Sequence, residues 1–86
     1  MAKYIIFKER GGTQKLPIIF PELEDHSDIC HLIENGLEAY KAVSAGFVCI
    51  EDGFVKPYGK SKSLNLSVAV GDNEILTSLL NEEPSI

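Results

Sequence analysis

Two runs of β-branched and aromatic residues predict a β-hairpin near the N-terminus. Residues 3–8 (KYIIFK) and 15–20 (KLPIIF) are separated by a short polar connection that contains Gly11 and Gly12. The glycine pair permits the positive-φ backbone of a turn, so the two runs are expected to pair as strands. Pro17 cannot donate a hydrogen bond to a neighbouring strand, so the second run should lie at a sheet edge or carry a bulge.

The middle of the chain predicts a second hairpin. Residues 40–50 and 54–56 are apolar and rich in β-formers, and Glu51-Asp52-Gly53 lies between them. Asp-Gly between apolar runs is typical of a two-residue hairpin turn, because glycine, and less readily aspartate, accepts left-handed backbone. Residues 63–70 (SLNLSVAV) alternate leucine or valine with polar or small residues, which is typical of a half-buried strand.

Two helical patterns complete the predicted fold. Residues 26–36 place apolar side chains on one helical face after acidic and hydroxyl residues suited to capping, and Gly36 ends that pattern. Residues 72–81 form a second, amphipathic pattern, with Asp72 or Asn73 as its expected cap. The sequence therefore predicts an α+β fold: a small antiparallel sheet of four or five strands, built from two hairpins, with two short helices.

Chain length and composition predict one folded domain over residues 1–86, with a frayed tail at 82–86. The chain has 86 residues, of which 44% are hydrophobic and 24% charged, as in ordinary globular proteins. A domain of this size buries little surface, so formation of a homodimer or higher oligomer is a plausible way to bury more.

The charge balance narrows the expected partners. The formal net charge is -5, from 13 acidic and 8 basic residues, which argues against direct binding to nucleic acid or to an anionic membrane. No apolar run approaches the roughly 18 to 20 residues that span a bilayer, and charges interrupt the first residues, so a cytoplasmic location is expected. Cys30 and Cys49 lie in core-like patterns and are expected to be buried thiols.

The segment 21–38 is strongly acidic and contains no lysine or arginine. One interpretation is a solvated face with favourable negative charge at a helix N-terminus. The other is a partner-facing acidic surface, formed by Glu22, Glu24, Asp25, Asp28 and Glu34.

The stretch 53–61 (GFVKPYGKS) is similar to a phosphate-binding loop but lacks its spacing. Five residues separate Gly53 from Gly59, whereas the G-x-x-x-x-G-K-[ST] pattern requires four. Ser61 also leads into a predicted strand rather than a helix, so these glycines are expected to serve backbone geometry.

Residues 58–63 (YGKSKS) remain a candidate anion-binding segment, because they combine an aromatic ring, two ammonium groups, hydroxyls and a glycine. As a strand, the segment would place Lys60 and Lys62 on one side and Ser61 and Ser63 on the other. The alternative is a solvated strand whose lysines discourage edge pairing. The candidate binding residues are Tyr58, Gly59, Lys60, Ser61, Lys62, Ser63 and Ser44.

No metal, cofactor or catalytic site is expected. His26 and Cys30 are at positions i and i+4 of the predicted helix, so both could face one metal ion. His31, however, points about 100 degrees away from Cys30, and no second pair of ligands follows at a suitable spacing. A cysteine and a histidine on one helix rarely align as nucleophile and base, and no oxyanion hole is suggested. The sequence therefore favours a protein that is not an enzyme.

Four short motifs resemble those of small proteins encoded by bacteriophages and prophages. The motifs are Ile18-Ile19-Phe20-Pro21, His26-Ser27-Asp28, Ser44-Ala45-Gly46-Phe47-Val48 and residues 58–64 (YGKSKSL). The resemblance covers most of residues 16–80 and implies a phage setting without an assigned activity. Within it, the candidate recognition positions are Ser44, Gly46, Tyr58, Gly59, Ser61 and Ser63, because exposed polar motif residues suit recognition better than packing. The sequence leaves open whether Ser44–Phe47 is buried.

These observations predict a non-enzymatic accessory protein of a phage or other mobile element that binds and inhibits or sequesters a host component, such as a defence protein. An acidic face could imitate nucleic acid toward a basic host surface. One alternative is an oligomer that binds a small anionic, nucleotide-like ligand with residues 58–63. Another is a structural or assembly subunit, favoured if the strand with Pro17 pairs between chains.

Overall fold

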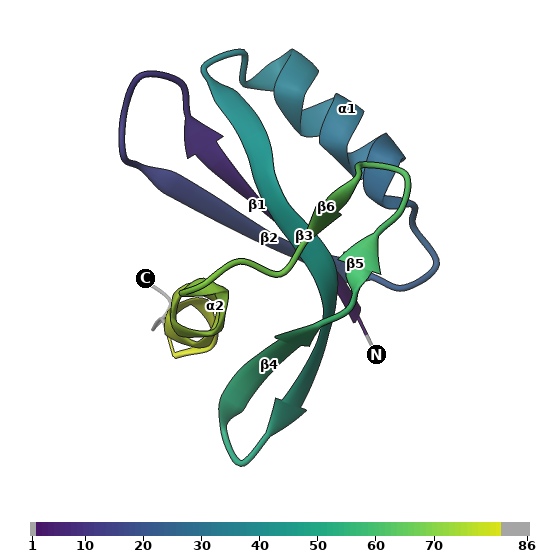
Figure 1. The fold of residues 1–86 in the computed structure, drawn as a ribbon, viewed down its shortest axis with the longest axis vertical. Coiled ribbons are helices and arrows are strands. Elements are labelled where there is room, and N and C mark those ends of the chain that lie inside the picture. The colour runs from purple at the N-terminus through teal and green to yellow at the C-terminus, as the bar shows by residue number, and fades with distance from the viewer. Residues whose placement is uncertain (1, 82–86) are drawn as a thin grey trace, which may run out of the picture.

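A four-stranded antiparallel sheet separates the two helices in the computed structural model, which describes residues 2–81 (Figure 1). The strand order is β2-β1-β3-β4, and β5 and β6 form a separate two-stranded sheet. The elements are β1 (Ala2–Glu9), β2 (Lys15–Pro21), α1 (His26–Gly36), β3 (Tyr40–Glu51), β4 (Phe54–Tyr58), β5 (Lys60–Ser61), β6 (Leu66–Ser67) and α2 (Asp72–Leu80). The predicted α+β architecture, with two hairpins and two short helices, is confirmed.

The central strand β1 is buried on both faces, which explains its uninterrupted apolar run. Ile5 and Phe7 pack on the side of α1, whereas Tyr4 and Ile6 pack on the side of α2, because successive side chains of a strand point in opposite directions. All four side chains are fully buried. The sheet therefore carries one apolar layer on each face.

The α1 side of the sheet holds the larger cluster. Phe20, Cys30, Ala42 and Ala45 join Ile5 and Phe7 there. Ile29 and Ile33 of α1 and Leu64 and Leu66 of the β5–β6 region cover this cluster. The sequence places Ile29, Leu32 and Ile33 on one helical face. Ile29 and Ile33 do pack on the sheet, whereas Leu32 is 68% exposed, so that part of the prediction is wrong.

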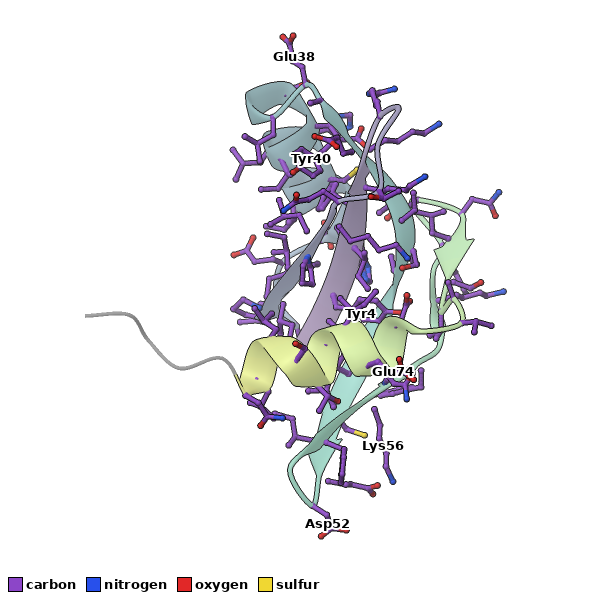
Figure 2. All side chains as sticks on the ribbon, turned by 90° about the vertical axis from the view of Figure 1, so that its left-hand side faces the viewer. Tyr4, Glu38, Tyr40, Asp52, Lys56 and Glu74 are labelled. Carbon is purple, nitrogen blue, oxygen red and sulfur yellow. The ribbon has the colours of Figure 1, made fainter. Side chains whose placement is uncertain are left out.

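Helix α2 is held on the opposite face by a buried polar contact. The Tyr4 hydroxyl donates to Asp72 Oδ2 at 2.7 Å, and the Ala69 N–H donates to the same oxygen at 3.0 Å. Burial, reinforced by the hydrogen bond to Asp72 and by its charge, raises the pKa of Tyr4 well above its ordinary value. In Figure 2, Tyr4 lies beside α2, which crosses in front of the lower part of the sheet.

The turns that the sequence predicted are confirmed by the backbone. Asp52 and Gly53 have φ of 51° and 80°, as a two-residue turn of this twist requires, and Gly11 has φ of 72° in the first hairpin. The predicted helical caps are wrong. Asp25 occupies the N-cap position of α1 but makes no side-chain cap hydrogen bond, and the N-cap of α2 is Gly71, which has no side chain. Asp72 does not cap α2 because its carboxylate is used by Tyr4 and by Ala69.

Both edges of the sheet are short of outward hydrogen-bond donors. Strand β2 is an edge, as Pro17 predicted. Glu9 N–H donates to Gln14 O, and hydrogen-bonded positions alternate along an antiparallel pair, so the backbone nitrogens of Pro17 and Pro21 face away from β1. On the other edge, Val55 N–H donates to Thr77 Oγ1 of α2 at 3.1 Å, and Pro57 has no N–H. This arrangement discourages addition of a further strand.

The predicted strand over residues 63–70 is wrong. Only Leu66–Ser67 is a strand, and residues 62–65 form turns in which Asn65 has φ of 55°. Leu64 and Leu66 pack on the α1 side of the sheet, whereas Val68 packs on the α2 side. The alternating residues therefore serve two different faces, because the chain crosses from one side of the sheet to the other here.

The predicted frayed tail at 82–86 lies outside the described residues. Neither α1 nor α2, the helices of residues 2–81, is long and apolar enough to cross a membrane.

Replacing Tyr4 by phenylalanine should lower the free energy of unfolding by about 1–3 kcal/mol, because the buried Asp72 carboxylate would lose a donor. Urea unfolding followed by circular dichroism measures this change. Tyr40→Phe is the matched control, since Tyr40 packs beside the α1-side cluster instead. Equal losses in the two variants would contradict a special role for the Tyr4–Asp72 contact.

Candidate functional site

Four aromatic rings form a row that fixes Tyr58 at the end of β4. Phe20 meets His26 edge-on at 5.5 Å between ring centroids, and His26 meets Phe47 edge-on at 5.7 Å. Phe47 then stacks on Tyr58 at 5.8 Å. We call these four residues the aromatic row; edge-to-face and stacked geometries at such distances are the favourable ones for rings.

His26 locks this row to the sheet. It is the first residue of α1, it is buried, and its Nε2–H donates to the Gly46 carbonyl oxygen at 2.9 Å. A buried ring nitrogen with a backbone partner is a structural contact rather than a free metal ligand. The start of α1, the middle of β3 and the end of β4 are thereby held together.

Gly46 and Gly59 allow the chain to leave β4 across β3. A Cβ on Gly46 would lie 2.7 Å from the Tyr58 carbonyl oxygen and 3.3 Å from the Tyr4 ring. Gly59 has φ of 75°, and a Cβ there would lie 3.1 Å from the Phe47 ring. These two motif glycines are therefore required by close packing and backbone geometry.

Two of the motif serines, Ser44 and Ser61, are buried. Ser44 is 1% exposed and Ser61 is 2% exposed, and Gly46 is also buried, so these three residues are not exposed recognition positions. Ser61 Oγ accepts from Leu64 N–H at 3.3 Å and lies 3.4 Å from Ser63 Oγ, which stabilises the turn that follows β5. Within residues 2–81, Ser44 Oγ is the buried side-chain oxygen that lacks a hydrogen-bond partner.

The segment 58–63 is consequently split between two roles. Tyr58 is 39% exposed, and Gly59, Lys60, Lys62 and Ser63 are exposed, whereas Ser61 points inward. The expected strand with lysines on one side and serines on the other is wrong, because β5 ends at Ser61 and Lys62 begins a turn. Ser44 does not share this surface, since it is buried opposite Ile6.

The exposed lysines border a shallow hollow. Its volume is about 300 Å³, and it is lined by Lys60, Ser61, Lys62, Asn65, Leu66 and Ser67. Two ammonium groups beside hydroxyl and amide groups can hold a small anion. We call this feature the β5–β6 hollow.

The acidic residues of the candidate surface fall into two groups. Glu22, Glu24, Asp25 and Asp28 are exposed, and we call them the acidic segment. Glu34 is half-buried, and its Oε2 accepts from Ala42 N–H at 2.9 Å, so it joins α1 to β3. Within residues 2–81 the only ion pair joins Lys56 to Glu51, so the acidic segment carries no ion pair there.

The acidic segment lies next to the aromatic row. Glu22, Glu24 and Asp25 occupy the connection between Phe20 and His26, which are two members of that row, and Asp28 lies in the first turn of α1. Figure 1 shows this connection passing the end of the sheet near β5. The exposed carboxylates of this connection and the Tyr58 ring are therefore attached to one group of packed rings.

The cysteines and histidines do not assemble a metal or nucleophile site. Among residues 2–81, no three histidine, cysteine or acidic side chains gather in a geometry suited to a metal ion. Both cysteines are free; Cys30 is buried as expected, whereas Cys49 is only half-buried. Burial, together with the nearby charge and hydrogen bond of Glu34, raises the pKa of Cys30 to about 11, so its thiol is protonated near neutral pH.

Comparison with protein-family models, with curated protein sequences and with solved structures finds no match to this chain.

Substituting Gly46 by alanine should lower the free energy of unfolding by about 1–3 kcal/mol, because its methyl group would overlap the Tyr58 carbonyl. Gly36→Ala is the control, since a Cβ at that helical position meets nothing within 4 Å and should be neutral or slightly stabilising. Thermal unfolding measures both variants. A fully stable Gly46→Ala variant would show that the chain at Tyr58 moves aside without cost.

Proposed function

We propose that this chain is a non-enzymatic binding protein that recognises a partner protein through the acidic segment and Tyr58. The observation that supports this proposal is the aromatic row, which presents an exposed tyrosine ring and carboxylates that form no ion pair within residues 2–81. Such pre-organisation lowers the entropy that the surface loses when it binds. Buried packing alone does not require this arrangement of exposed groups.

Tyr58 has the properties of an interface anchor. Its ring is 39% exposed, yet its stacking on Phe47 limits its rotation. Tyrosine is enriched among the residues that dominate binding energy, since it offers a large apolar ring at a small cost in conformational entropy. Exposed carboxylates around it would add charge complementarity and faster association with a basic partner.

The resemblance of the four short motifs to phage and prophage proteins suggests the biological setting of this proposal. In that setting the partner is a host protein with a basic surface, such as a defence protein, and the chain inhibits or sequesters it in the host cytoplasm. Imitation of nucleic acid by the acidic segment is the mechanism that the net charge of -5 favours.

The test is affinity capture from bacterial lysate with the intact chain and its variants. The amount of partner retained should be at least tenfold lower for Tyr58→Ala than for the wild type, and equally reduced for the double variant Asp25→Asn with Asp28→Asn. Phe54→Ala is the control, because Phe54 is a more exposed aromatic residue at the far end of the same strand. If all variants retain the same proteins as the wild type, this surface does not recognise a partner.

A second candidate function is binding of a small anion in the β5–β6 hollow. The observation that favours it is the convergence of Lys60 and Lys62 on one hollow with Ser67 and Asn65. Ammonium groups are suited to phosphate as compact point charges.

Replacing Lys60 and Lys62 together by alanine should change the free energy of unfolding by less than about 1 kcal/mol, because both side chains are exposed. The same variant should lose any mass added by a nucleotide mixture in native mass spectrometry. If the variant unfolds, the two lysines are structural. If the wild-type chain gains no mass, the second candidate function is wrong.

A further inference from the structure

Three lysines lie side by side across the sheet. Lys8 of β1 pairs with Lys15 of β2 and with Lys41 of β3. Cross-strand partners project from the same face of a sheet, and Lys8 follows Ile6 by two positions, so all three point to the α2 side. We call them the lysine row; all three side chains are exposed.

The strand register places like charges directly opposite one another. The bond from Glu9 N–H to Gln14 O at 2.9 Å makes Lys8 and Lys15 a non-hydrogen-bonded pair, the kind whose side chains are closest. Like charges directly opposite one another destabilise a sheet. The row therefore lowers the stability of the unbound fold.

No ion pair relieves this repulsion in the part of the chain that the structure describes. The single ion pair of residues 2–81 joins Lys56 to Glu51, at the other end of β3. The chain has 13 acidic residues against 8 basic ones, so neutralising partners are abundant in composition but not at this position. A costly cluster of like charges without counter-charges is typical of a binding surface rather than of a structural element.

Space for a ligand adjoins the row. A groove of about 1010 Å³ separates the first hairpin from α2, and Lys15 lines it. Thr13 and Ser78 add hydroxyl groups to its walls, and Glu74 of α2 adds a carboxylate on the side opposite the hairpin.

We propose that Lys8, Lys15 and Lys41 bind a compact oligophosphate, either a free polyphosphate chain or the phosphates of a nucleotide. Ammonium groups are compact charges suited to phosphate oxygens. Strands about 4.8 Å apart make the row about 10 Å long, which matches a short phosphate chain better than a single ion. This site is separate from the acidic segment and from the β5–β6 hollow.

The surroundings of the row disfavour larger polyanions. A long nucleic acid strand would continue onto a chain of net charge -5, which repels it. The nearest tyrosine, Tyr40, pairs with Glu9 and packs on the α1 side, so the row offers no ring on which a base could stack. Recognition by phosphate charge alone is what the row can supply.

The experiment is a thermal-shift and calorimetric titration of the full chain with inorganic tripolyphosphate, ATP, orthophosphate and a hexaglutamate peptide at low salt. Tripolyphosphate should raise the melting temperature of the wild type by a few degrees, as a ligand of the folded state does. Lys8→Gln should weaken its binding at least tenfold. Without ligand, Lys8→Gln should melt higher than the wild type, because both like-charge pairs are removed.

ATP distinguishes the sources of the phosphate chain. Equal affinity for ATP and tripolyphosphate indicates recognition of the phosphates alone, and tighter binding of ATP indicates that the nucleoside enters the groove beside Lys15. Both results support the proposed site, since both require the row.

Lys56→Gln is the matched control, because it removes one exposed positive charge outside both the row and the β5–β6 hollow. The proposal is overturned if Lys8→Gln and Lys56→Gln weaken binding equally, if hexaglutamate binds as tightly as tripolyphosphate, or if no anion binds. Loss of binding only in a Lys60→Gln and Lys62→Gln double variant would assign the anion to the β5–β6 hollow instead. None of these outcomes bears on partner capture by Tyr58.

Discussion

The buried hydrogen bond between Tyr4 and Asp72 is the contact on which the second layer of this fold depends. Helix α2 has nine residues and lacks a side-chain cap, and an isolated helix of that length is not stable in water. Asp72 and Leu76 attach it to β1 and its neighbours, and Thr77 then covers the backbone of β4. Without this contact, α2 would depend on the packing of Ile75 and Leu76 and on the Thr77 hydrogen bond.

The same tyrosine connects the fold to the candidate surface. The Tyr4 ring and the Tyr58 carbonyl both approach Gly46, which leaves no room for a side chain there. His26 binds the carbonyl of that glycine, and through it the aromatic row is aligned. The placement of the exposed Tyr58 is therefore a consequence of core packing, which explains how a chain of 86 residues can present a rigid surface.

The topology also separates opposite charges. Lys15 begins β2 and the acidic segment follows its end, so a strand of seven residues, about 20 Å or more in length, lies between them. Charges this far apart are largely screened at physiological salt, where the Debye length is about 8 Å. The acidic segment and the lysine row can therefore act as independent surfaces for partners of opposite charge.

The sequence by itself determined the elements whose signals are local. The Asp52-Gly53 turn, the helix over residues 26–36 and the edge position of β2 follow from backbone preferences and periodicity, and the structure has all three. Only the tertiary structure decided that residues 63–70 cross between two faces, and that Ser44 and Ser61 are buried. The hydrogen bond between Tyr4 and Asp72, the row of four rings and the pairing of Lys8 with Lys15 and Lys41 are likewise visible only in the tertiary structure. The physical reason is that strand register and packing depend on contacts between residues far apart in the chain, which neighbouring residues do not encode.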